Sequence, residues 1–251
     1  MRIAIFSDVH GNLTALEAVL DDIAGRAVDE VVFAGDLCMM GPRPGASLRM
    51  VQEARIACIY GNTDDWILGR QAPPEMLATI AEWTLNKLSE TDKSWLDGLA
   101  FSKCFSPTGI EKDDLLVVHA NPLDVNQIIF PPEEEQMARY GRIRQSDEEL
   151  AGLVAELDAA ALAFGHLHIP NERSWKQLEL FNISSVSMPG DGDPRAKYGL
   201  FSWNGTAWMY EKCAVKYDIA PELAAYQQKR PPGWEKIVQT IEAEGCFPQR
   251  V

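Results

Sequence analysis

The 251-residue sequence contains no long hydrophobic run. No uninterrupted apolar stretch approaches the roughly 18–20 residues that a membrane-spanning helix needs. The first residues, MRIAIFSD, are too short to form the apolar region of a signal peptide, and they offer no small-residue cleavage site. We therefore expect a cytoplasmic protein that has no membrane partner.

Paired cysteines are also lacking. The five cysteines are scattered at positions 38, 58, 104, 213 and 246, and no two of them have the spacing C-x-x-C. An odd number of unpatterned cysteines without a secretory signal indicates reduced thiols rather than a disulfide framework.

Positive charge is scarce. The chain has 23 lysines and arginines against 37 aspartates and glutamates, which gives a net charge of −14. A field of this sign repels long polyanions, so we expect no binding of a nucleic-acid duplex through a basic surface. A small anionic substrate remains compatible with this charge, because bound metal cations would dominate the local field.

The order of the predicted elements indicates an α/β fold in a single domain over residues 1–251. The N-terminal part alternates strands at 2–6, 30–35 and 56–61 with helices at 13–25 and 46–55. This βαβαβ order implies parallel strands that are joined by right-handed crossovers.

The rest of the chain continues the alternation of strands and helices. The patterns predict helices within 64–98, strands near 100–106 and 114–119, a partly helical loop at 120–145, a helix capped by Ser146 and Glu149, and a strand at 161–165. Strand-like segments around an Asn204-Gly205 turn predict a hairpin of a second sheet within 176–218. A helical tail is predicted for 220–251.

Short polar clusters stand where five of the predicted strands end. They contain Asp8 and His10, Asp36, Asn62 and Asp64, His119, and His166 and His168. Ligand sites of open α/β sheets form outside the carboxyl ends of the strands, so these side chains are expected to meet in one region. The chain has only four histidines, and all of them lie in these clusters.

The donors in these clusters are those of a transition-metal site. Imidazole, carboxylate and amide ligands without thiolate suit Zn, Mn, Fe or Ni. Asp8 and His10 are two positions apart, so both can point to the same side of an extended strand end and bind one ion. Seven donors exceed the needs of one ion. If Asp36 bridges, two divalent ions about 3.5–4 Å apart can share the set.

With these residues in place, the chain resembles the calcineurin-like metallophosphoesterases. The motifs of that family occur in order as DVH, GD, GNTD, VVHA and GHLH over residues 8–168. The segment MPGDGDPRAKYGLF and the helical tail look like a branch of small bacterial and archaeal members. The resemblance implies a four-layer α/β/β/α sandwich with C-terminal helices.

The resemblance also implies a ligand set and a reaction. It assigns Asp8, His10, Asp36 and His168 to one metal ion, and Asp36, Asn62, His119 and His166 to the other. It implies hydrolysis of a small phosphorylated substrate, a phosphodiester or phosphoanhydride, by a metal-bridging hydroxide. Asn62 and Asp64 are the catalytic candidates, and Asn62, Arg195 and Lys197 are the substrate-binding candidates.

Two departures from the family pattern stand out. Thr63 occupies the position of a family histidine that contacts the phosphate and aids departure of the leaving group. Threonine cannot act as a general acid near neutral pH. Asp64 thereby loses the histidine that is its usual partner in the family. An equally good interpretation is that Asp64 is an ordinary acidic residue in the first turn of a helix. The second departure is NISSVS at 182–187, where the branch has an Asn-Pro-Gly-Ser-Val-Gly turn.

Two alternatives remain open on the sequence. A phosphoprotein phosphatase is disfavoured by the missing histidine at position 63. A non-catalytic protein-binding scaffold, like the retromer subunit of this fold, is disfavoured because all seven donors are present. A metal assay with hydrolysis of an aryl diester separates these alternatives.

Overall fold

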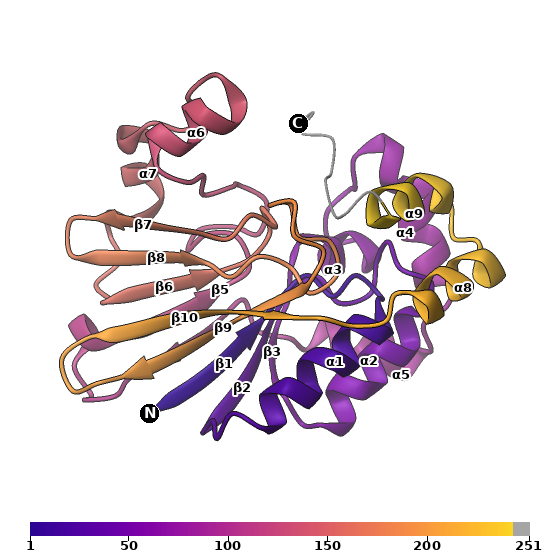
Figure 1. The fold of residues 1–251 in the computed structure, drawn as a ribbon, viewed down its shortest axis with the longest axis horizontal. Helices are drawn as coiled ribbons and strands as arrows, with labels where there is room; N and C mark the ends of the chain where they lie inside the picture. Colours follow the sequence, from indigo (N-terminus) through magenta and orange to yellow (C-terminus); the bar gives the residue numbers. More distant parts are fainter. Residues whose placement is uncertain (243–251) are drawn as a thin grey trace.

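The computed structural model describes residues 1–242, and Figure 1 shows their arrangement. The predicted helical tail appears as α8 (Ala220–Lys229) and α9 (Trp234–Glu242). The remainder of that prediction, residues 243–251, lies outside the described residues. Within 1–242 no helix is both long and apolar enough to cross a bilayer. The four cysteines of this range are free.

The first sheet has the strand order β10-β9-β1-β2-β3. Its parallel part consists of β1 (Arg2–Phe6), β2 (Glu30–Ala34) and β3 (Ala57–Ile59). Helices α1 (Leu13–Ala24) and α2 (Pro44–Glu53) make the two crossovers. The predicted βαβαβ unit is therefore confirmed.

The second sheet has the order β4-β5-β6-β8-β7. It contains β4 (Ser102–Phe105), β5 (Leu115–Val118), β6 (Ala161–Phe164), β7 (Asn171–Trp175) and β8 (Leu178–Asn182). Strands β5, β6 and β8 run parallel, and β4 and β7 close the two edges antiparallel.

The two sheets pack face to face with helices on both outer faces, so the four-layer prediction is confirmed (Figure 1). Alternate residues of β1 separate the layers: Ile3 and Ile5 face the second sheet, whereas Ala4 and Phe6 face the helices. Because both faces of each central strand are buried, these strands are short, continuous apolar runs.

The predicted second-sheet hairpin within 176–218 is wrong. The hairpin around Asn204 and Gly205 exists, but its strands β9 (Ala196–Trp203) and β10 (Trp208–Val215) extend the first sheet through antiparallel pairing of β9 with β1. The second sheet receives a different hairpin, β7–β8, whose strand β7 was not predicted. A turn motif is a local signal, whereas the sheet that a hairpin joins depends on long-range burial.

The helices between β3 and β4 follow the prediction for 64–98. They are α3 (Asn62–Ile67), a 3₁₀ turn η1 (Glu75–Leu77), α4 (Ala78–Leu85) and α5 (Glu90–Asp97). The predicted cap at Ser146 is present as a capping box before α7 (Asp147–Val154), and a second capping box at Ser89 precedes α5. The loop at 120–145 contains one helix, α6 (Glu133–Tyr140). A second 3₁₀ turn, η2 (Glu111–Asp113), precedes β5.

Candidate metal centre

The structure brings the seven candidate metal ligands together at the carboxyl ends of β1, β2, β5 and β6 and the first turn of α3. Ligand atoms of Asp8, His10 and His168 lie within 4.8 Å of one another, and so do those of Asp8, Asp36 and His119. The Oδ1 atom of Asp8 is 3.0 Å from Nε2 of His168. Two donor groups therefore share one buried edge of the two sheets.

The carboxylate of Asp36, a member of the second group, also approaches His10 of the first. Its Oδ2 atom is 3.8 Å from Nε2 of His10, and its Oδ1 atom is 3.5 Å from Nε2 of His119. One carboxylate thus presents each oxygen to a different imidazole. This is the geometry that a bridging ligand needs.

The remaining two donors, Asn62 and His166, lie beside His119. The amide Oδ1 of Asn62 is 2.8 Å from Nε2 of His119, and the rings of His119 and His166 have centroids 5.1 Å apart. The side chain of Asn62 is buried at the start of α3. Asn62 and His166 therefore adjoin the second donor group through His119.

Backbone carbonyl groups fix the orientation of every imidazole. The Nδ1 atoms of His10, His119 and His168 lie 3.1, 2.9 and 3.0 Å from the carbonyl oxygens of Met39, Ala34 and Met188. When Nδ1–H donates to the carbonyl oxygen, Nε2 of the same ring carries no proton, and its lone pair faces the cluster. At His166 the roles are reversed, because Nε2 lies 2.9 Å from the carbonyl oxygen of Asn126 and leaves Nδ1 free.

In these tautomers, acceptor atoms of the cluster face one another, and a cation between them would bind both. Nε2 of His10 is 3.2 Å from Nε2 of His168, and Nε2 of His119 approaches Oδ1 of Asn62 at 2.8 Å. In each pair both atoms are acceptors, so neither can satisfy the other. A transition-metal ion held by nitrogen and oxygen donors satisfies both pairs. The donor set therefore fits a metal centre.

The electrostatics of the centre also favour a cation. Burial by itself disfavours a charge on His10, but the nearby carboxylates of Asp8 and Asp36 raise its pKa above the ordinary value. Burial also opposes a charge on His119, yet Asp36 and Asp8 raise the pKa of that residue. The buried carboxylates thus attract positive charge to both donor groups.

The backbone at the ligands departs from the usual conformations. Five of the seven ligands have a positive φ, between 49° and 66°: Asp8, His10, Asp36, His166 and His168. This left-handed conformation costs a non-glycine residue about 1–2 kcal/mol and is typical of functional sites. The adjoining glycines supply room. A Cβ atom on Gly61 would lie 2.2 Å from Oδ1 of Asp36, and one on Gly165 would lie 2.3 Å from Oδ2 of Asp8.

Asp64 has a buried carboxylate that faces the backbone beside the centre. Its oxygens accept hydrogen bonds from the backbone N–H groups of Gly61, Asp36 and Leu37. Burial and the charge of Asp36 raise the pKa of Asp64 to about 6, although the three backbone hydrogen bonds lower it. In this position Asp64 holds the Asp36 loop in place, and its assignment as a catalytic residue stays a prediction.

We expect Asp64→Asn to lower the free energy of unfolding by about 1–3 kcal/mol. An amide group would replace one acceptor oxygen and leave a buried backbone N–H without a partner. Urea denaturation measures the loss. Asp65→Asn is the matched control, because the neighbouring Asp65 pairs with the partly exposed Arg70 and should cost less than about 1 kcal/mol. Equal losses in the two variants would contradict the anchoring role of Asp64.

The two basic substrate-binding candidates do not behave alike. Lys197 is 1% exposed, and its Nζ atom bonds to Oδ1 of Asp191 and to the carbonyl oxygen of Asp193. Its ammonium group is thus paired within its own loop, and its assignment as a substrate contact stays a prediction. In the sequence, a basic residue in a polar loop looks the same whether its side chain binds a substrate or pairs with another residue of the loop. Arg195 is exposed and pairs with Asp193.

The unusual NISSVS segment has a structural role that the sequence did not reveal. Ser185 Oγ donates to the carbonyl oxygen of Asp8, and Ser184 Oγ donates to that of His168. The backbone N–H of Ser187 also donates to Asp8. The segment therefore braces two candidate ligands. A run of serines carries no sequence signal for this task, because the acceptors are main-chain carbonyls.

Comparisons with known proteins agree with this geometry. Residues 1–205 match the family model of the calcineurin-like phosphoesterase superfamily domain. The chain is 26% identical over 238 residues to an uncharacterised protein of Methanocaldococcus jannaschii, which covers 92% of this chain and 94% of that protein. It is 24% identical over 210 residues to the phosphodiesterase YfcE of Escherichia coli, with 80% and 86% of the two chains covered. A crystal structure of a metallophosphoesterase from Sphaerobacter thermophilus has a TM-score of 0.73 and 27% identity, over 97% of this chain and 99% of that chain.

Proposed function

Because the chain belongs to the calcineurin-like phosphoesterase superfamily, we propose that it is a dinuclear metal-dependent phosphohydrolase. Its proposed substrates are small phosphodiesters or phosphoanhydrides. The observation that carries the proposal is the carboxylate of Asp36, which presents one oxygen to His10 and the other to His119. The name of the YfcE relative, a phosphodiesterase, supports the choice of diesters.

Two ligand sets would hold the ions, which we propose to be Mn, Fe, Zn or Ni. The first set is Asp8, His10, Asp36 and His168, and the second is Asp36, Asn62, His119 and His166. When bound, such ions neutralise phosphoryl charge and lower the pKa of water. The backbone carbonyl partners of the imidazoles hold the lone pairs in position for the ions.

The remaining groups of the chain position the substrate. The Oδ1 atom of Asn62 faces His119, so its amide Nδ2 is the donor available to a phosphoryl oxygen. Arg195 is the one basic candidate that is exposed, and we propose it as an outer contact to the anionic substrate. Thr63 supplies no acidic proton to the leaving group. The negative net charge makes a nucleic-acid duplex an unsuitable substrate.

The proposal is tested by metal content and hydrolysis together. Protein purified without a chelator should contain up to two transition ions per chain by elemental analysis and should hydrolyse bis(p-nitrophenyl) phosphate. Chelation should stop hydrolysis and lower Tm, because an ion that binds only the folded state stabilises it by about 2.7 kcal/mol at a hundred times its Kd. A folded protein that takes up none of the four metals and hydrolyses neither mono- nor diesters would favour the non-catalytic scaffold instead.

A further inference from the structure

The matched family domain ends at residue 205, yet the segment that follows β10 contacts residues close in sequence to His10 and to its carbonyl partner Met39. We propose that the tail residues Tyr217, Glu222 and Tyr226 are positioning residues for the ion held by His10. The inference rests on the proposed dinuclear centre. It assigns a role to a part of the chain that the family domain does not include.

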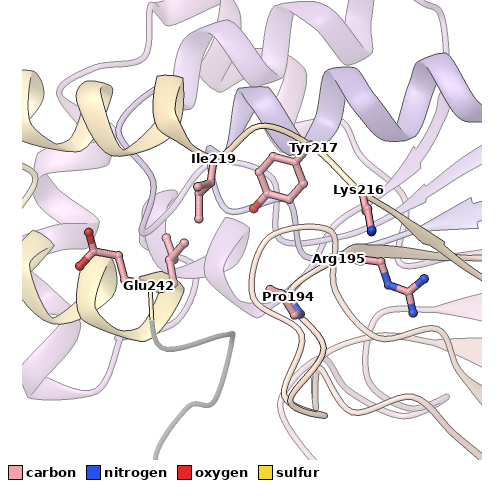
Figure 2. Close-up of a pocket in the computed structure, with 7 residues that line it drawn as sticks. Pro194, Arg195, Lys216, Tyr217, Ile219 and Glu242 are labelled. Atoms are coloured by element: carbon pink, nitrogen blue, oxygen red, sulfur yellow. The ribbon is translucent and has the colours of Figure 1, made fainter.

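The first contact joins Tyr217 to the loop after β1. The amide Nδ2 of Asn12 donates to the hydroxyl oxygen of Tyr217 and to Oγ of Ser187, at 3.3 Å in both cases. Asn12 also caps α1, two residues after His10. Figure 2 shows Tyr217 on the connection to α8, near the loop that carries Pro194. A hollow of ≈ 470 Å³ lies beside the ring, which also packs against the core on the helical side of the first sheet.

The second contact is a buried ion pair. The carboxylate of Glu222, which is fully buried, accepts hydrogen bonds from the backbone N–H and hydroxyl of Thr14 and from the guanidinium of Arg43. The backbone N–H of Arg43 in turn donates to the carbonyl oxygen of Gly11, the residue after His10. Glu222 therefore ties the first turn of α1, four residues after His10, to the loop between β2 and α2.

The third contact reaches the loop behind the His10 ring. The hydroxyl of the fully buried Tyr226 donates to the carbonyl oxygen of Met40 at 3.4 Å. Met40 follows Met39, whose carbonyl oxygen is the partner of His10 Nδ1. This loop packs tightly against the backbone of His10, because a Cβ atom on Gly41 would lie 2.0 Å from the carbonyl oxygen of His10. A shift of the tail therefore moves the group that orients the imidazole.

Partners that orient metal ligands are typically worth 10–100-fold in metal affinity. Glu222→Gln keeps the shape of the side chain but removes its charge from Arg43. We expect the variant to bind one of its two ions about tenfold more weakly than wild type does, and the other ion unchanged. The probe is Co²⁺, titrated by visible absorption into metal-depleted protein, with Tm recorded for every sample.

Two further variants separate positioning from a general loss of stability. The double variant Tyr217→Phe/Tyr226→Phe removes only two hydroxyl groups. It should weaken the binding of the same ion as Glu222→Gln does. Tyr198→Phe is the matched control, because its buried hydroxyl donates to Asp22 at the far end of α1. It should lower Tm and leave both affinities unchanged. If Glu222→Gln does not fold, the tyrosine pair decides.

The inference fails if the folded tail variants bind both ions as wild type does, or if Tyr198→Phe weakens Co²⁺ binding equally. These results differ from a failure of the proposed function, in which wild-type protein binds no Co²⁺ at all. Hydrolysis of an aryl diester is a secondary measurement and does not decide the question.

Discussion

Asp36→Asn is expected to weaken the binding of both metal ions and to lower phosphodiester hydrolysis by about 10³-fold. Metal ions contribute several kcal/mol to the stabilisation of transition-state charge, and about 4 kcal/mol corresponds to that factor. The two oxygens of Asp36 face different histidines, so the substitution affects both donor groups at once. Elemental analysis and kcat/KM for an aryl diester measure the two effects.

The structure offers suitable controls for this prediction. Asparagine has the shape of aspartate and can still accept the hydrogen bond that Thr63 N–H donates to Oδ1 at 2.9 Å, so the loop should keep its conformation. His168→Asn and His166→Asn each alter a single donor group. Each of these variants should weaken the binding of mainly one ion. Retention of both ions and of full activity by Asp36→Asn would show that the residue does not bridge.

The gathering of the site was predictable because its residues follow strands. A parallel sheet brings strand ends to one edge, so the polar residues at the ends of 2–6 and 30–35 meet in the first sheet, and those at the ends of 114–119 and 161–165 meet in the second. The face-to-face packing of the two sheets then joins the two pairs. The βαβαβ unit followed from apolar periodicity alone. These are local patterns whose consequences are fixed by the geometry of a parallel sheet.

Other features depend on contacts that no local pattern encodes. The antiparallel pairing of β9 with β1 joins Phe201 to Ile3 across most of the chain length. The left-handed backbone of Asp8 and His10 arises where strand ends meet neighbouring loops. The burial of Lys197 under Asp191 is likewise a tertiary outcome. Residue type gave the chemistry of these positions, but long-range packing decided their orientation.

The second large effect concerns the leaving group, and it depends on Thr63. General acid assistance is worth about 10²–10⁴-fold, and alkyl monoesters need it because they expel a strongly basic alkoxide. Aryl esters and anhydrides expel weaker bases and need it less. We therefore expect kcat/KM for aryl diesters, nucleotide diesters and dinucleoside polyphosphates to exceed that for phosphoserine by about 10²-fold or more.

The structure places residue 63 well for a test of this argument. The backbone N–H of Thr63 contacts the carboxylate of Asp36, and its buried hydroxyl has no hydrogen-bond partner within residues 1–242. A histidine at this position would lie beside the metal centre. Asp64 would not orient the new imidazole, because its carboxylate already accepts three backbone hydrogen bonds. The gain should therefore lie near the lower end of the range for general acids.

We expect Thr63→His to raise phosphoserine turnover by about 10²-fold and to change aryl diester turnover little, so that the gap between the two substrates narrows. Thr63→Val is the matched control, because it removes the hydroxyl at nearly constant volume. If threonine provides no acid, this variant should keep the wild-type ratio of diester to monoester kcat/KM. The measurement is kcat/KM for both substrates in the three proteins, at equal metal occupancy. Wild-type turnover of phosphoserine above that of diesters and anhydrides would refute the argument, since an enzyme without a proton donor at position 63 would then expel the more basic leaving group faster.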